Sequence, residues 1–183
     1  MFRYKDVSFA GRFLFYDICS KSDLMEYRIG SGVDFHQLKK GKELWLGGVK
    51  IPYHKGAVGH SDADVLLHAV CDALLGALAL GDIGIHFPDT SNEFKNIDSK
   101  ILLQRTFDII KKEGYKVANV DSTICLETPK LKTHTDEMRN IIATILELTP
   151  GDVSIKATTT EKMGFVGKGK GIVAYATVLL KKD

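Results

Sequence analysis

Asp34 and His36 offer the clearest chemistry in the sequence, because they stand two residues apart in a segment expected to be a strand. Side chains two apart on a strand point to the same face, so a carboxylate and an imidazole converge there. A helical segment further on places Asp64, His68 and Asp72 on one face, at i, i+4 and i+8. Two imidazoles and one carboxylate are a typical catalytic zinc set with an open fourth position. On spacing alone, histidines satisfied by ordinary hydrogen bonds explain such a pattern more often than a metal does.

A second group lies in the segment Lys-Ala-Thr-Thr-Thr-Glu-Lys at residues 156–162, at the end of an expected strand. Three hydroxyls, exposed backbone amides and a flanking lysine suit phosphate oxygens, and Glu161 offers a hard oxygen ligand for magnesium. The competing explanation is that threonine runs occur in strands because of their β propensity.

The glycine-rich segments give weaker signals. Gly81-Asp82-Ile83-Gly84, followed by Phe87-Pro88-Asp89, lets the backbone approach a ligand and supplies acids that accept hydrogen bonds from sugar-like hydroxyls. A turn-rich loop explains the same residues without a ligand. The glycines around Lys168 match neither a phosphate-binding loop of the Walker type nor a dinucleotide fingerprint, since the spacing is wrong and no helix pattern follows.

The elements that must position these residues alternate between strands and helices. Strands are predicted at 27–36, 43–51, 116–127, 152–160 and 171–180, and helices at 61–80, 99–114 and 135–148. We expect Ser61 to open the first helix, with Asp64 in a variant capping box, and Ser99 to cap the second. Residues 53–61, 81–98 and 163–170 are predicted loops. The pattern favours a single α/β domain of the α+β type, a mixed sheet with three main helices on one face.

Composition limits the classes of function. The chain has 183 residues, a net charge of +2 and 44% hydrophobic residues, typical of a globular domain and too neutral for a nucleic-acid or membrane surface. Its three cysteines lack a CxxC spacing, which favours a reducing compartment. Residues 1–26 form an aromatic N-terminal extension to a domain at 27–183. Asp6 and Arg12 argue against a signal peptide, leaving a targeting remnant, an added strand or a disordered tail.

Taken together and in order, these motifs resemble the 2-C-methyl-D-erythritol 2,4-cyclodiphosphate synthase family of the non-mevalonate isoprenoid pathway. The resemblance covers about residues 27–181. It rests on the string from Arg28 to His36, the string His60-Ser61-Asp62-Ala63-Asp64 with His68, the two glycine- and proline-containing segments, and residues 156–165. It implies cyclisation of 4-diphosphocytidyl-2-C-methyl-D-erythritol 2-phosphate with release of CMP, by attack of the substrate's own 2-phosphate on its β-phosphorus.

The resemblance also implies roles for individual residues. Zinc would be held by Asp34, His36 and His68, and magnesium or manganese by Glu161, with Asp72 or Asp64 orienting a zinc ligand. His60 and Thr159 would stabilise the transition state. The residues implied in substrate binding are Asp34, His36, His60, Ser61, Asp82, Ile83, Gly84, Phe87, Pro88, Asp89, Thr90, Ser91, Lys130, Leu131, Ala157, Thr158, Thr159, Thr160, Glu161, Phe165 and Lys168. Of these, Lys130, Leu131, Ala157 and Thr158 would form the cytidine-diphosphate pocket.

The same resemblance implies a homotrimer with active sites between subunits and a central cavity for an isoprenoid diphosphate. Lys168 and Lys170 depart from the basic–acidic pair that is frequent in bacterial members, and residues 1–26 have no counterpart in the compact bacterial form. We therefore expect a plastid stromal protein if the source is eukaryotic and a cytoplasmic one if it is bacterial. Two alternatives are a zinc phosphodiesterase that uses metal-bound water and a catalytically silent trimer that binds isoprenoid diphosphates.

Overall fold

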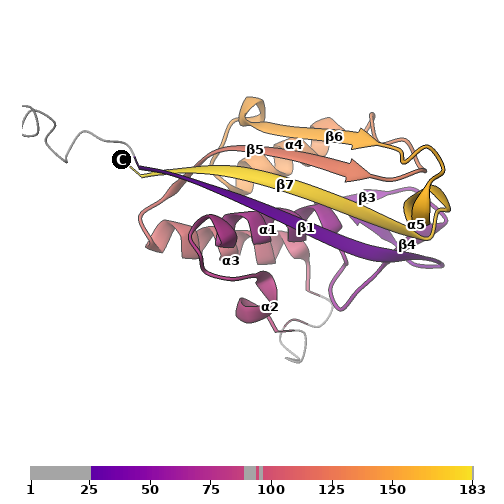
Figure 1. Cartoon of the computed structure of the whole chain (residues 1–183), viewed down its shortest axis with the longest axis horizontal. Helices are drawn as coiled ribbons and strands as arrows, with labels where there is room; N and C mark the ends of the chain where they lie inside the picture. The colour runs from indigo at the N-terminus through magenta and orange to yellow at the C-terminus, as the bar shows by residue number, and fades with distance from the viewer. Residues whose placement is uncertain (1–25, 89–93, 95–96, 183) are drawn as a thin grey trace, which may run out of the picture.

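A computed structural model describes residues 26–88, 94 and 97–182, which form a five-stranded mixed sheet with helices on one face (Figure 1). The strands lie in the order β4-β1-β7-β5-β6, and β5 and β6 are parallel while the other pairs are antiparallel. Their bounds are β1 Glu26–Lys40, β4 Lys55–Val58, β5 Lys116–Cys125, β6 Val153–Thr158 and β7 Gly171–Lys182. A separate hairpin joins β2 (Leu44–Leu46) to β3 (Val49–Ile51).

Three main helices cover one face of the sheet. They are α1 (Val65–Ala77), α3 (Ser99–Lys112) and α4 (Thr135–Ile145), and the short elements α2 (Ile83–His86), η3 (Pro150–Asp152) and α5 (Gly164–Gly167) complete the described chain. α1 packs on β1 and β7, α3 on α1, and α4 on β6. Large apolar side chains of this layer, such as Leu74, Phe107 and Ile142, are fully or almost fully buried. The mixed sheet with three main helices on one face confirms the predicted fold class.

Several predicted boundaries were wrong. The first helix begins at Val65, and Asp64 rather than Ser61 is its N-cap, accepting hydrogen bonds from the N–H groups of Leu66 and Leu67. Asp98 rather than Ser99 caps α3. β4 occupies part of the predicted 53–61 loop, and the predicted strand 43–51 is a hairpin whose turn is Gly47-Gly48, both with positive φ. That conformation favours glycine, which explains why one strand could not continue through it.

Side chains of the long strand β1 alternate between the two faces of the sheet, so its polar cluster residues and its exposed apolar residues lie on opposite faces. Asp34 and His36 lie on the side that faces α1, where both hydrogen-bond to His68. The alternate residues Tyr27, Ile29, Val33 and Phe35 are between 43% and 72% exposed, on the face that none of the three main helices covers. Tyr175 of β7 is exposed as well. One face of the sheet therefore carries the core and the polar cluster. On the other face, β1 and β7 present exposed apolar side chains, whereas β5 and β6 present polar ones, among them the ion pair of Asp121 and Lys156.

Gly30 and Gly32 of β1 allow α1 to lie directly on the strand. A Cβ atom at residue 30 would fall 2.0 Å from the carbonyl oxygen of Ala73, and one at residue 32 would fall 2.1 Å from that of Ala69. No heavy atom tolerates such distances, so α1 could not approach as closely over any other residue type. The approach brings His68, one residue before Ala69, beside Asp34 and His36.

We expect Gly32→Ala to lower the free energy of unfolding by about 3 kcal/mol, because α1 must move away from β1 to admit the methyl group. Gly76→Ala is the matched control: a Cβ there meets nothing closer than the Ser31 carbonyl oxygen at 3.8 Å. Alanine at this exposed helical position should stabilise by up to about 1 kcal/mol. Denaturant unfolding of both variants measures the difference, and equal stabilities would contradict the proposed role of the glycine.

Candidate metal centre and active site

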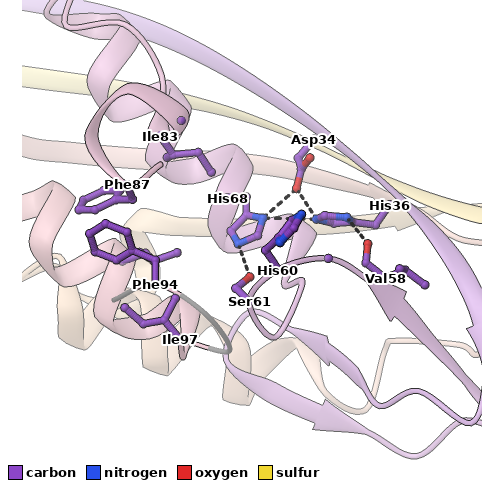
Figure 2. A pocket seen from close by; sticks show the side chains of 13 residues that line it. Asp34, His36, Val58, His60, Ser61, His68, Ile83, Phe87, Phe94 and Ile97 are labelled. Atoms are coloured by element: carbon purple, nitrogen blue, oxygen red, sulfur yellow. Dashed lines mark hydrogen bonds and ion pairs between the residues drawn. The ribbon is translucent and has the colours of Figure 1, made fainter. Parts of the chain in front are cut away.

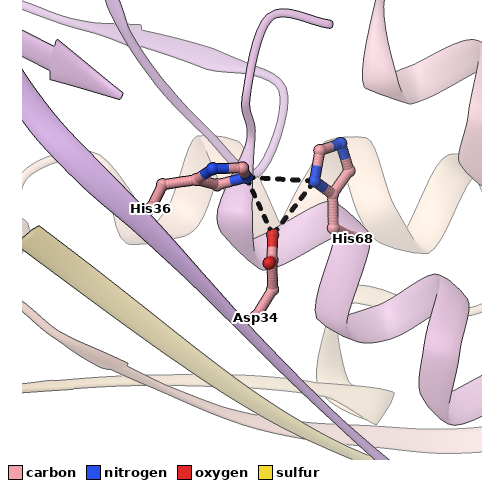
Figure 3. Close-up of side chains that lie close together, drawn as sticks. All are labelled: Asp34, His36 and His68. Carbon is pink, nitrogen blue, oxygen red and sulfur yellow. Dashed lines mark hydrogen bonds and ion pairs between the residues drawn. The ribbon is translucent and has the colours of Figure 1, made fainter. Parts of the chain in front are cut away.

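Asp34, His36 and His68 converge on one point between β1 and α1 (Figure 3). The Asp34 Oδ2 atom lies 2.9 Å from His36 Nε2 and 3.0 Å from His68 Nδ1, and the two nitrogens are 3.4 Å apart. Each residue can offer one ligand atom, and all three atoms lie within 4.8 Å of one another. The structure thus brings together the three residues that the sequence placed on a strand face and a helix face.

The surroundings of His36 and His68 fit a cation at this point. The carbonyl oxygen of Val58 in β4 lies 3.0 Å from His36 Nδ1 and can only accept, so Nδ1 donates and Nε2 presents a lone pair to the cluster. On the far side of His68, Nε2 lies 2.9 Å from Ser99 Oγ and 3.2 Å from Ser61 Oγ. Lone pairs and a carboxylate pointing at one another are unfavourable without a positive charge between them. The donor set therefore suits a metal ion.

The pKa values of Asp34 and His68 are shifted because these charged and polar groups lie so close together. Burial raises the pKa of Asp34, but the adjacent imidazoles of His36 and His68 outweigh it and hold that pKa well below its usual range. Burial lowers the pKa of His68, and the hydrogen bond and charge of Asp34 reverse this and raise it. In the metal-free protein, the raised pKa of His68 favours a proton on this imidazole, whose positive charge would offset the charge of Asp34.

A cavity of about 480 Å³ opens beside the cluster (Figure 2). His60 and Ser61 stand at its polar end, next to His36 and His68, while Phe87 and Phe94 form an apolar wall at the other end. The remaining lining residues are Asp34, Val58, Gly59, Ile83, Gly84, Ile97 and Leu102. The cluster is therefore open on one side to a molecule with both polar and apolar parts.

Asp64 and Asp72, the two acids expected to orient a metal ligand, both accept hydrogen bonds from backbone N–H groups. The fully buried Asp64 carboxylate accepts hydrogen bonds from the N–H groups of Gly47, Gly48, Leu66 and Leu67. Burial raises its pKa, and the backbone hydrogen bonds act in the opposite direction. Asp72 Oδ1 accepts a hydrogen bond from Ile83 N–H at 2.8 Å, so it fixes the start of α2. Asp64 thus caps α1 and Asp72 holds the cavity wall, and the expectation that one of them orients a metal ligand stays a prediction.

Residues expected to bind the cytidine diphosphate gather at a different place. Lys130, Leu131, Ala157, Thr158 and Thr159 line a cavity of about 240 Å³ beyond the end of β6, together with Leu126 and Pro129. Among the described residues, it has no lining residue in common with the first cavity. Since β1 and β6 are three strand spacings apart in the sheet, about 14 Å separates the two strands.

The segment after β6 holds Glu161 next to this second cavity. Thr159 Oγ1 donates to Glu161 Oε1 at 3.0 Å, and Thr160 N–H donates to Glu127 Oε2 at 3.3 Å. Glu161 and Lys162 have φ values of 50° and 64°. Such conformations cost energy for residues with a Cβ and are concentrated at functional sites. In the single chain, Glu161 is thus grouped with Thr159 and not with Asp34.

The remaining expected site residues are placed as follows. Asp82 caps α2 through a hydrogen bond from Ile85 N–H, and Pro88 is exposed after the cavity-lining Phe87. Phe165 packs against Phe35, with ring centroids 6.3 Å apart, and Lys168 is exposed at the end of α5. Asp89, Thr90 and Ser91 lie outside the described residues.

Sequence reasoning missed Val58, Asp62 and Ser99 as contributors to the site. Val58 was missed because β4 was taken for a loop. Asp62 lay within the recognised string but had no assigned role, and Ser99 was taken for a cap. A serine within a run of helical residues can equally be buried, so its pattern alone gave little signal.

The YgbB family profile matches residues 27–181. The chain belongs to the YgbB family. Its curated relatives include the 2-C-methyl-D-erythritol 2,4-cyclodiphosphate synthase of Bacteroides thetaiotaomicron, 59% identical over 87% of this chain and 100% of the relative. The synthase of Natranaerobius thermophilus is 57% identical over 85% of this chain and 98% of the relative.

Solved structures of YgbB relatives share the fold. A bifunctional protein of Campylobacter jejuni matches with a TM-score of 0.84 and 40% identity, over 87% of this chain and 43% of that one. A CDP complex from Plasmodium falciparum matches with a TM-score of 0.76 and 35% identity, over 86% and 97%. The chain is therefore an enzyme of the lyase class, in a family active in isoprenoid biosynthesis.

The expectation of a plastid protein finds no support in these relatives. Both curated relatives named above are bacterial. In the described part of the chain, no helix has the length and apolar character needed to cross a membrane. We set the plastid interpretation aside, and a cytoplasmic location stays a prediction.

The pKa shifts predict opposite pH dependences for the metal-free and the zinc-loaded protein. In the metal-free protein, the raised His68 pKa gives stability that is complete below the ordinary value of 6.5 and is lost as pH rises through the raised value. The lowered Asp34 pKa gives stability present above 3.8 and lost only as pH falls through the lowered value. Zinc competes with protons, so with zinc added stability should instead increase with pH across this range.

The free energy of unfolding, measured between pH 5 and 9 with a chelator and with zinc, tests both predicted pH dependences. His68→Ala should remove the decline seen with chelator, whereas replacement of the exposed His54 should keep it. Identical slopes with chelator and with zinc would contradict a metal at this cluster.

Proposed function

We propose that the protein converts 4-diphosphocytidyl-2-C-methyl-D-erythritol 2-phosphate to 2-C-methyl-D-erythritol 2,4-cyclodiphosphate and CMP. The observation that carries the proposal is the convergence of Asp34, His36 and His68 at the mouth of a cavity, in a chain of the YgbB family. A bond forms between an oxygen of the 2-phosphate and the β-phosphorus. The bond from that phosphorus to the oxygen shared with the α-phosphate breaks, and CMP leaves with that oxygen.

Asp34, His36 and His68 would hold Zn²⁺, and Glu161 would hold Mg²⁺ or Mn²⁺. When bound, these ions offset the negative charge of the phosphates and so ease their mutual approach. No protein nucleophile is required, because the attacking oxygen belongs to the substrate. The main task of the chain is then to hold attacking oxygen and phosphorus close together and in line.

The residues around the cluster supply binding and orientation. His60 and Ser61, at the polar end of the first cavity, would contact the phosphates and the methylerythritol part, with Phe87 along its apolar side. Lys130 and the threonines at 158 and 159 line the second cavity, where a lysine and hydroxyls suit a cytidine diphosphate. Thr159, held by Glu161, would face the phosphates and help to stabilise the transition state.

We further propose that the enzyme is a homotrimer whose active sites lie between subunits. The two cavities of one chain are separate, yet one substrate must reach the cluster and the cytidine pocket together. The uncovered sheet face, with Ile29 72% and Phe35 54% exposed, offers an apolar surface for further copies of the chain. In a cyclic trimer, the first cavity of one subunit can meet the second cavity of its neighbour.

An isoprenoid diphosphate in the centre of that trimer stays a prediction. Phe165 stacks against Phe35 at one end of the apolar sheet face, and Lys168 and Lys170 are exposed nearby in sequence. An apolar tail beside the aromatic rings and a diphosphate head near the lysines would suit these residues.

Substitutions should distinguish the proposed zinc site from the proposed magnesium or manganese site. Asp34→Ala is expected to lose bound zinc and to reduce CMP release by roughly 10²-fold or more. Glu161→Gln should keep its zinc but lose the dependence of CMP release on added magnesium or manganese. Metal analysis together with product analysis provides the measurement. Full zinc occupancy in Asp34→Ala would contradict the assignment, and a hydrolysed product in place of the cyclic diphosphate would favour the phosphodiesterase.

Mixed trimers test whether the sites are shared. Asp34→Ala and Lys130→Ala chains, refolded together in equal amounts, should form intact sites at about a quarter of the interfaces, because each interface needs one chain of either kind in the correct order. CMP release should then exceed that of either variant alone. Verified mixed trimers with no recovered activity would mean that each site is built from one chain.

A further inference from the structure

Ser99 occupies an unusual position between a candidate metal ligand and a carboxylate. It is the first residue of α3 and is fully buried. Its Oγ atom lies 2.9 Å from His68 Nε2 and 2.5 Å from Asp62 Oδ1. The other oxygen of Asp62 accepts a hydrogen bond from Ser99 N–H at 3.0 Å. Within the described part of the chain, the hydrogen bond from this pair to the cluster runs through His68.

Each of Asp62, Ser99 and His68 has a defined donor or acceptor role in this series of hydrogen bonds. An ionised carboxylate only accepts, so Asp62 takes the single hydroxyl proton of Ser99. The Ser99 oxygen is then an acceptor toward His68, and Nε2 of His68 must carry a proton to meet it. A neutral imidazole has one N–H, which leaves the lone pair on Nδ1, the atom that faces Asp34 and His36.

Asp62 itself is held firmly enough to act in this way. Its Oδ1 atom also accepts a hydrogen bond from Asp64 N–H at 3.2 Å, and its own N–H donates to the Ile97 carbonyl oxygen at 3.3 Å. The loop that precedes α1 and the start of α3 are therefore joined around His68. Ser61 has less influence on which nitrogen of His68 carries the proton, because its Oγ atom is 3.2 Å from Nε2, whereas Ser99 Oγ is 2.9 Å away.

We propose that Asp62 and Ser99 are positioning residues that set the tautomer and the ring orientation of His68 for metal binding. Their part corresponds to that of the Val58 carbonyl oxygen toward His36. The inference rests on the proposed metal centre and adds two residues to it. The competing explanation is that the pair only fastens α3 to the neighbouring loop, in which case its loss would lower stability without a specific effect on metal binding.

Zinc affinity of the full chain, measured by competition with a chelating dye at fixed pH, separates these explanations. Ser99→Ala should bind Zn²⁺ about 10- to 100-fold more weakly than the wild type. Ser122→Ala is the matched control: Ser122 is 2% exposed and its Oγ donates to the Ser154 carbonyl oxygen at 2.9 Å, away from the cluster. It should lose comparable stability and keep its zinc affinity. Equal zinc affinity in wild type and Ser99→Ala would overturn the inference while leaving the metal centre intact.

A second measurement needs no variant and so remains decisive if Ser99→Ala does not fold. In the zinc-loaded wild type with ¹⁵N-labelled histidine, the Nε2–H proton of His68 should exchange slowly with solvent and be observable by NMR. A His68 Nε2–H that exchanges as fast as a ring N–H of the exposed His54 would overturn the proposed hydrogen bond. Failure of the wild type to bind zinc at all would instead overturn the proposed function, and this inference with it.

Discussion

The close approach of α1 to β1 is the constraint on which the site depends. The helix lies so near the strand at Gly30 and Gly32 that a single methyl group at either position would collide with helix carbonyl oxygens. That distance lets the short side chain of Asp34 on the strand reach His68 on the helix. The same packing buries the apolar side of α1 against β1 and β7, so the hydrophobic energy of the core holds the polar cluster together.

The cluster formed in this way is unfavourable unless a positive charge occupies it. Asp34 and both imidazoles point toward one another, and the outer nitrogens of the imidazoles are engaged by the Val58 carbonyl oxygen and by hydroxyl groups. A proton on His68 meets this need in the metal-free protein, and a divalent ion meets it better because it satisfies three ligand atoms at once. Proton binding, metal binding and folding stability are thereby coupled at this cluster.

Much of this arrangement could be predicted from the spacing of residues in the sequence. The two-residue spacing of Asp34 and His36 and the helical pattern around His68 gave the correct faces, since local geometry decides them. Asp64 and Asp72 lie on the same helical face as His68 but accept hydrogen bonds from backbone N–H groups of other segments. The sequence alone does not show where those N–H groups lie. Ser99 and Val58 come from segments distant in the sequence, and only the tertiary packing brings them to the histidines. The separation of the two cavities is likewise a consequence of strand order, with β7 and β5 inserted between β1 and β6.

Anomalous diffraction from crystals grown with zinc tests whether Asp34, His36 and His68 bind one metal ion. Data collected on either side of the zinc absorption edge locate the ion without reference to activity. We expect one strong peak per chain, about 2.0–2.2 Å from Asp34 Oδ2, His36 Nε2 and His68 Nδ1. A zinc-loaded crystal with no peak between these atoms, or with its peak at other residues, would contradict it.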